Sequence, residues 1–133
     1  MSGDVYEDAW PIRLLASMGF EMCIAQSFAK NFGLYSERVG ALHVVVKCPS
    51  ARGPVLSQLS YMQRAEVSTP PAFGARIVAR VFRSKDLMWE WERDLVLMAG
   101  RVKLMRRALY GELCRLGTPG EWNHIVNQVP RVS

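Results

Sequence analysis

The chain has 133 residues, of which 50% are hydrophobic and 22% are charged, so its composition is that of an ordinary globular domain and excludes a disordered chain. No run of about 18 apolar residues occurs, and the acidic start MSGDVYEDAW lacks the features of a signal peptide, so we expect a cytoplasmic chain that does not enter a membrane. The net charge of +5 permits binding to polyanions without showing it, and three widely spaced cysteines favour reduced thiols over disulfides or zinc.

One helix and two strands are predicted in the first 47 residues. Asp8 is expected to cap a helix that continues to about Met18 and stops at Gly19. Residues 21–27 and 41–47 are almost continuous apolar runs, which predict two strands of a sheet covered on both faces. The segment between them contains glycines, an asparagine and aromatic residues, so it is predicted to be an ordered loop.

Three helices are predicted in the rest of the chain. Apolar residues at helical spacing predict the first up to about Val67, and Thr69 is expected to cap a short second helix that ends at Phe82. The third runs from about Ser84 to Leu116, and Gly117 ends it. At about 1.5 Å per residue this helix is roughly 50 Å long, which suits either a coiled coil or a helix that bridges two domains.

Lys30 lies in the predicted loop among aromatic and aliphatic residues, where its ammonium group is expected to be partly desolvated. A neutral lysine can attack an aldehyde and form a Schiff base. A cofactor aldehyde that carries a phosphate also needs anion ligands near that amine. Ser27 offers a hydroxyl and Arg38 a planar guanidinium, so the pattern suits an anchor for pyridoxal phosphate. On composition alone, a solvated surface lysine is the competing interpretation.

The segment QSFAKNFGLYSERVG, residues 26–40, resembles the cofactor-lysine segment of the class I aspartate aminotransferases. The resemblance continues in SGDVYEDAW, STPPAFGARIV and LGTPGEWNHIVNQ, and it covers the chain from Ser2 to about Gln128 in the family's order. It implies an α/β fold that is part of the pyridoxal-phosphate-dependent aminotransferase fold (type I), with an incomplete mixed sheet, flanking helices and one long inter-domain helix. Residues 1–82 would then be the C-terminal part of the large cofactor-binding domain, and residues 83–133 the linking helix and the start of the small domain.

The resemblance also implies roles for four residues. Lys30 would bind pyridoxal phosphate covalently and later move a proton between the substrate and the cofactor. Ser27 and Arg38 match the family's phosphate ligands. Arg64 matches the arginine that binds the distal carboxylate of aspartate or glutamate, and it would reach the neighbouring subunit's site in a homodimer.

Two departures from the family's pattern have consequences. Thr69 stands where the family usually has an asparagine, so any contact of that amide is in doubt. The family's other cofactor ligands and its arginine for the α-carboxylate have no counterpart in the sequence, which looks like a middle-to-late piece of an aminotransferase, from a truncated gene product or an incomplete gene model. We therefore expect the chain alone to lack transamination, to be marginally stable and to expose apolar edges.

Other function classes are less well supported. Five cations, Arg101, Lys103, Arg106, Arg107 and Arg115, could track nucleic-acid phosphates, but acidic residues share their helix and a solvated face is the better interpretation. His43 and His124 have no companions at metal-ligand spacing, so we expect structural histidines and no metal site. Met88, Met98 and Met105 are expected in the core. The remaining alternative is a non-catalytic subunit or fragment that pairs with an intact aminotransferase.

Overall fold

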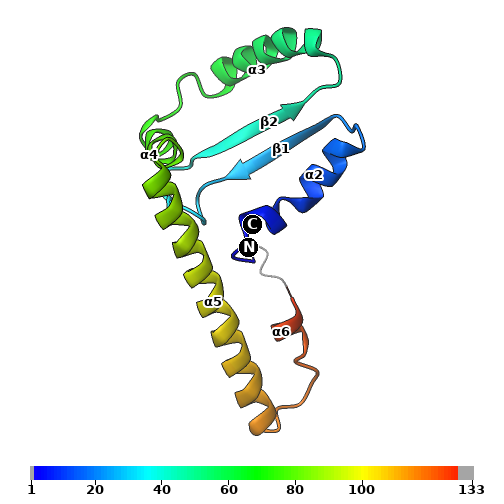
Figure 1. The fold of residues 1–133 in the computed structure, drawn as a ribbon, viewed down its shortest axis with the longest axis vertical. Coiled ribbons are helices and arrows are strands. Elements are labelled where there is room, and N and C mark those ends of the chain that lie inside the picture. Colours follow the sequence, from blue (N-terminus) through cyan, green and yellow to red (C-terminus); the bar gives the residue numbers. More distant parts are fainter. Residues whose placement is uncertain (1, 129–133) are drawn as a thin grey trace. The chain divides into compact units, whose positions relative to one another are not determined.

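The computed structural model describes residues 2–128, which form a two-stranded sheet and a set of helices (Figure 1). The predicted α/β class is thus confirmed. In chain order the elements are α1 (Val5–Asp8), α2 (Trp10–Ser17), β1 (Met22–Ser27), β2 (Gly40–Val45), the 3-10 helix η1 (Pro49–Ala51), α3 (Arg52–Glu66), α4 (Phe73–Phe82), α5 (Lys85–Arg115) and α6 (His124–Asn127).

The chain divides into two compact units. One consists of Pro11–Ser84, and the other of the described parts of Met1–Trp10 and Lys85–Ser133. The first unit contains the sheet and α2 to α4, and the second contains α1, α5 and α6. The expected division between residues 82 and 83 into parts of the family's two domains stays a prediction.

The sheet is a single antiparallel pair, drawn in Figure 1 as two arrows of opposite direction. Met22 pairs with Val45 at one end and Ser27 with Gly40 at the other, and the Phe28 N–H donates to the Val39 carbonyl one step further. None of the strand residues is buried, so the prediction of a sheet covered on both faces is wrong for this chain. An apolar run permits burial, but burial also needs elements packed on each face.

The N-terminal helix differs from its prediction. Asp4, and not Asp8, is the cap, because the Asp4 carboxylate accepts hydrogen bonds from the N–H groups of Tyr6 and Glu7 at 2.8 and 3.0 Å. Asp8 ends α1, and its carboxylate accepts from the Ser2 N–H at 2.9 Å. A separate helix starts at Trp10, since Pro11 cannot donate a hydrogen bond but is tolerated in a first turn.

The helix after the double proline also begins later than expected. It starts at Phe73 with Ala72 as its N-cap, so Thr69 is not a cap. Proline disfavours the helical conformation in the residue before it, so the Thr69-Pro70-Pro71 sequence keeps the chain extended. The helix before this break, α3, matches its prediction and ends at Glu66.

The long helix is confirmed, since α5 contains 31 residues. At about 1.5 Å per residue it is roughly 46 Å long. Gly117 ends the helix in the left-handed conformation, with a φ of 61°. The Thr118 N–H donates to the Leu113 carbonyl, as is common where a glycine terminates a helix. The short helix α6, which the sequence did not predict, lies beside the C-terminal half of α5 (Figure 1).

Few side chains are buried in the part of the chain that the structure describes. Leu95 and Ala99 are buried on α5, and Phe28, Ala29 and Val78 are buried in the unit that holds the sheet. The expectation that Met88, Met98 and Met105 belong to a core is wrong for two of them, because Met98 and Met105 are 41% and 59% exposed, whereas Met88 is half-buried. Many other large apolar side chains are exposed, which confirms the expected exposed apolar surface. Within residues 2–128, every helix is too short or too polar to cross a bilayer.

Candidate active site

The antiparallel register brings Ser27 and Arg38 together. Ser27 is the last residue of β1 and pairs with Gly40, the first residue of β2, and Arg38 precedes Gly40 by two positions. A hollow of about 260 Å³ lies at this end of the sheet. Its lining residues are Ala25, Gln26, Ser27, Ala29, Arg38, Val39 and Gly40. The two residues that the sequence proposed as phosphate ligands therefore share one hollow.

Both polar side chains keep hydrogen-bonding capacity for an anion. The Ser27 hydroxyl oxygen accepts from the Ala29 N–H at 3.2 Å, which uses a lone pair and leaves the O–H as a donor. The Arg38 Nη1 donates to the Tyr35 carbonyl at 3.3 Å, and a guanidinium has four further N–H groups. One hydroxyl and one exposed guanidinium suit a phosphate group.

Close backbone packing holds the segments that carry Ser27 and Arg38 in place. A Cβ at Gly40 would lie 2.6 Å from the Gln26 carbonyl oxygen, so only glycine fits beside β1 at this position. On the other side of the loop, a Cβ at the buried Gly74 of α4 would lie 2.8 Å from the Glu37 Cβ. Arg38 itself has a φ of 50°, a left-handed conformation that is uncommon for a residue with a side chain. The loop is therefore fixed at the residue that carries the guanidinium.

Lys30 lies in a turn anchored by aromatic rings. Phe28, Phe32 and Phe82 pack edge to face, with ring centroids 5.5 to 6.0 Å apart. The Phe32 N–H donates to the Phe28 carbonyl and the Gly33 N–H to the Lys30 carbonyl, so the backbone on both sides of Lys30 is held. Phe82 is the last residue of α4 and lies 52 positions after Lys30, so periodicity in the sequence did not connect them.

The Lys30 side chain is exposed, and Lys30 does not line the hollow formed by Ser27 and Arg38. The expectation that its surroundings desolvate the ammonium group is therefore wrong for this chain. Its Nζ instead lies 4.7 Å from the centroid of the Tyr35 ring. The segment from Ser27 to Arg38 thus carries three of the four predicted residues, but only Ser27 and Arg38 line one hollow.

Arg64 lies apart from this group. It is exposed in the last turn of α3 and does not line the hollow. His43 on β2 is confirmed as a hydrogen-bonded histidine, with its Nε2 2.9 Å from the Gln26 Oε1. Among the residues that the structure describes, no three metal-ligating side chains cluster.

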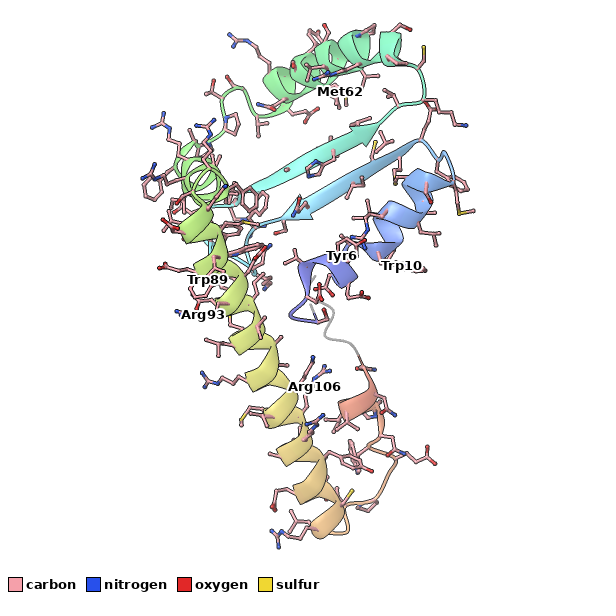
Figure 2. All side chains as sticks on the ribbon, viewed as in Figure 1. Tyr6, Trp10, Met62, Trp89, Arg93 and Arg106 are labelled. Atoms are coloured by element: carbon pink, nitrogen blue, oxygen red, sulfur yellow. The ribbon has the colours of Figure 1, made fainter. Side chains whose placement is uncertain are left out.

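Several cations of α5 take part in local contacts. Lys103 donates to the Ser2 carbonyl at 3.0 Å, Arg106 donates to the Gln128 carbonyl, and Arg115 pairs with Glu112 at 2.8 Å. Figure 2 shows Arg106 projecting from α5 on the side of α6. These contacts favour the interpretation of this cluster as structural and solvated over a track for nucleic-acid phosphates.

The comparisons with known proteins agree with this arrangement. The profile described as "Aminotransferase class I and II" matches residues 1–131. The cytoplasmic aspartate aminotransferase of Gallus gallus is 51% identical over 128 residues, which are 96% of this chain and 31% of that protein. The crystal structure of aspartate aminotransferase from Trypanosoma cruzi superposes with a TM-score of 0.88 at 47% identity, covering 96% of this chain and 32% of the other.

A third relative contains the cofactor. The aromatic-amino-acid aminotransferase of Burkholderia pseudomallei, covalently bound to pyridoxal phosphate, superposes with a TM-score of 0.90 at 35% identity, covering 96% of this chain and 33% of that one. The chain therefore belongs to the class I and II aminotransferases, which are transferases of amino groups. It spans about a third of the length of the relatives that it matches.

Proposed function

We propose that this chain is part of an aspartate aminotransferase, a pyridoxal-phosphate-dependent enzyme that transfers amino groups between L-aspartate and 2-oxoglutarate. The observation that supports this most directly is the hollow lined by Ser27 and Arg38, three positions before and eight positions after Lys30. The 51% identity to a relative named aspartate aminotransferase supports the substrate class.

The side chains at the hollow fit the phosphate group of this cofactor. Arg38 supplies a fixed positive charge and a fork of N–H donors, and Ser27 supplies an O–H donor. The hollow of about 260 Å³ is smaller than the 300–1,000 Å³ of typical complete ligand sites. It can therefore hold one end of a cofactor. When bound, pyridoxal phosphate acts as an electron sink for the substrate's α-carbon.

Lys30 supplies the amine in this proposal. Its Nζ would bind the cofactor covalently and, when released, would accept and return the proton that leaves the substrate's α-carbon. Its side chain is long and exposed, so the nitrogen can move between these positions. The ring cluster of Phe28, Phe32 and Phe82 fixes the backbone from which it reaches.

Arg64 is the proposed ligand for the distal carboxylate of aspartate or glutamate. Its exposed position at the end of α3, away from the hollow, suits a residue that serves the active site of a second subunit. The enzyme would then be a homodimer, with small dicarboxylic amino acids and 2-oxo acids as its substrates. Residues 1–82 would belong to the large domain, and residues 83–133 would form the linking helix and begin the small domain.

The cytoplasm is the proposed compartment. It rests on relatives whose names place them there, such as the cytoplasmic aspartate aminotransferase of Caenorhabditis elegans, which is 49% identical.

The test is covalent labelling of Lys30. The purified chain is incubated with pyridoxal phosphate, reduced with borohydride and digested, and the modified lysines are mapped by mass spectrometry. We expect the label at Lys30 in preference to Lys47, Lys85 and Lys103, because Ser27 and Arg38, three positions before and eight positions after Lys30, line a hollow that suits a phosphate group. Equal labelling of the four lysines would contradict the cofactor role.

The alternative is a non-catalytic fragment that pairs with an intact aminotransferase. The exposed apolar side chains favour it, because large apolar surfaces tend to associate. Co-purification with a tagged, full-length homologue would support this alternative, and a chain that elutes alone at high partner concentration would contradict it.

A further inference from the structure

Tyr35 contacts both cations of the candidate site. Its backbone carbonyl accepts the hydrogen bond from the Arg38 Nη1 at 3.3 Å. Its ring lies under the Lys30 ammonium group, with the Nζ 4.7 Å from the ring centroid. The two contacts use different parts of the residue, so a substitution of the side chain changes the contact with Lys30 and leaves the carbonyl for Arg38.

The contact between Lys30 and Tyr35 is a cation–π interaction. The face of an aromatic ring carries partial negative charge and attracts a cation within about 6 Å of its centroid. The Tyr35 side chain is 57% exposed, so water weakens the attraction, and the weaker end of the usual range applies. The backbone of Tyr35 is held by its hydrogen bond with Arg38, so the contact with the ring also limits the positions of the flexible lysine side chain.

This attraction acts on the charged ammonium group and not on a neutral amine. A lysine must lose its proton before its nitrogen attacks a carbonyl, and the positive charge that the ring attracts is then gone. The Lys30 nitrogen therefore leaves a favourable contact before it reacts. The contact belongs to the resting state of the free lysine.

We propose that Tyr35 is a positioning residue for Lys30, whose ring holds the free ammonium group over its face and restrains its reaction with aldehydes and acyl donors. A role for this restraint in transamination rests on the proposed function. The contact between Lys30 and Tyr35 does not depend on that function, because it involves only side chains of this chain.

The experiment measures the reactivity of each lysine in the 133-residue chain. The chain is treated with limiting acetic anhydride, which has no phosphate and so does not use Ser27 or Arg38. Mass spectrometry gives the initial rate of acetylation of Lys30 relative to that of the exposed Lys47. The same ratio is measured for Tyr35→Leu, which removes the ring, and for Tyr35→Phe, which keeps it.

We expect Tyr35→Leu to raise the ratio by about two- to fivefold, the range that an exposed cation–π contact supports. Tyr35→Phe should stay within twofold of the parent chain, because phenylalanine also presents a ring face. An unchanged or lower ratio in Tyr35→Leu would overturn the proposal, and so would an equal rise in both variants. If Tyr35→Leu perturbs the fold, as seen from its circular dichroism, Tyr35→Gln repeats the test.

Labelling by pyridoxal phosphate and borohydride separates this inference from the proposed function. If Tyr35 acts as proposed and the function is correct, Tyr35→Leu speeds both acetylation and labelling at Lys30. If acetylation responds to the ring but pyridoxal phosphate never selects Lys30 in the parent chain, the positioning role stands and the cofactor proposal fails. If pyridoxal phosphate selects Lys30 but the ring has no effect on either rate, the positioning role fails alone.

Discussion

Arg38 combines an unusual backbone conformation with a charged side chain. A φ of 50° costs a residue with a Cβ about 1–2 kcal/mol relative to glycine. The loop keeps arginine there, although glycine would fit the backbone better. Retention of a strained residue is a reason to look for a function of its side chain. The hollow that Arg38 shares with Ser27 suits the function proposed for it, the binding of an anion.

The substitution Arg38→Gly separates these two properties. We expect the free energy of unfolding to stay level or to rise by at most about 1.5 kcal/mol, since relief of strain exceeds or balances the roughly 0.5–1 kcal/mol that glycine loses in conformational entropy. Labelling of Lys30 by pyridoxal phosphate should fall about tenfold or more, because a charge-assisted hydrogen bond is lost. Urea unfolding and quantitative mass spectrometry measure the two effects. Full labelling of Lys30 in Arg38→Gly would contradict the phosphate role of Arg38.

Cys48 provides a residue-scale prediction outside the site. The Ser50 hydroxyl lies 2.9 Å from the Cys48 sulfur, and this hydrogen bond, followed by one from the Ser50 N–H, lowers the pKa of the thiol. A lower pKa gives a larger fraction of thiolate at a given pH, and the thiolate is the reactive form of cysteine. Ser50→Ala should therefore raise the pKa of Cys48 and slow its alkylation by iodoacetamide at pH 8.

The exposed Cys23 is the internal standard for this measurement. The profile of alkylation rate against pH should shift to higher pH for Cys48 in Ser50→Ala and stay in place for Cys23. Coincident Cys48 profiles in the parent chain and the variant would show that the serine does not control this thiol.

At the scale of elements, two glycines decide how closely the backbone segments of the site approach each other. Gly40 starts β2 against the Gln26 carbonyl of β1, and Gly74 lets α4 approach the loop that carries Arg38. Both contacts join residues distant in sequence. The helical glycines of α5 differ, since Gly111 is exposed and a Cβ there would meet open space. Glycine therefore has opposite effects on stability in the sheet and in the long helix.

Gly40→Ala and Gly111→Ala form a matched pair that tests this difference. Gly40→Ala should lower the free energy of unfolding by about 1–3 kcal/mol, because the backbone oxygen of Gln26 must shift. Gly111→Ala should raise the stability of α5 by about 0.5–1 kcal/mol through the better helix propensity of alanine. Urea unfolding followed by circular dichroism measures both, and a destabilised Gly111→Ala or a neutral Gly40→Ala would contradict the geometry.

Among the described residues, the buried apolar side chains are few and the exposed ones are many, which is unusual for a domain that folds independently. Trp89 is 61% and Met62 58% exposed, and Figure 2 labels both side chains on their helices. Trp89 is partly covered by Arg93, whose guanidinium carbon lies 5.1 Å from its ring centroid. Burial of apolar surface is the main favourable term in folding, so we expect a chain that leaves this much exposed to be marginally stable by itself.

At this scale we expect the 133-residue chain to show no transamination of aspartate with 2-oxoglutarate. Under the proposed function the hollow has room for only one end of a cofactor, and Lys30 is exposed. A coupled assay for oxaloacetate, with an intact aspartate aminotransferase as positive control, measures this. Steady turnover that is lost in Lys30→Ala would overturn the expectation. Size-exclusion chromatography at several concentrations should also show association of the chain.

The sequence alone was sufficient for the class of fold, the helices α3 and α5, the approximate strands and the segment that carries Ser27, Lys30 and Arg38. The helices and strands follow from local periodicity and from the positions of glycine and proline, whereas the class of fold and the site segment follow from the resemblance to the aminotransferases. The resemblance in that segment also anticipated the family to which the chain belongs.

Only the tertiary structure decided which predicted residues meet and which are buried. The strand register placed Ser27 and Arg38 at one hollow. The Phe82 ring, at the end of α4, packs against Phe32 in the turn of Lys30, and the exposed Lys30 lies over the Tyr35 ring. Burial of the strands failed as a prediction for the same reason. Burial of a strand depends on other segments that pack on its faces, and an apolar run in the sequence shows only that such packing would be favourable.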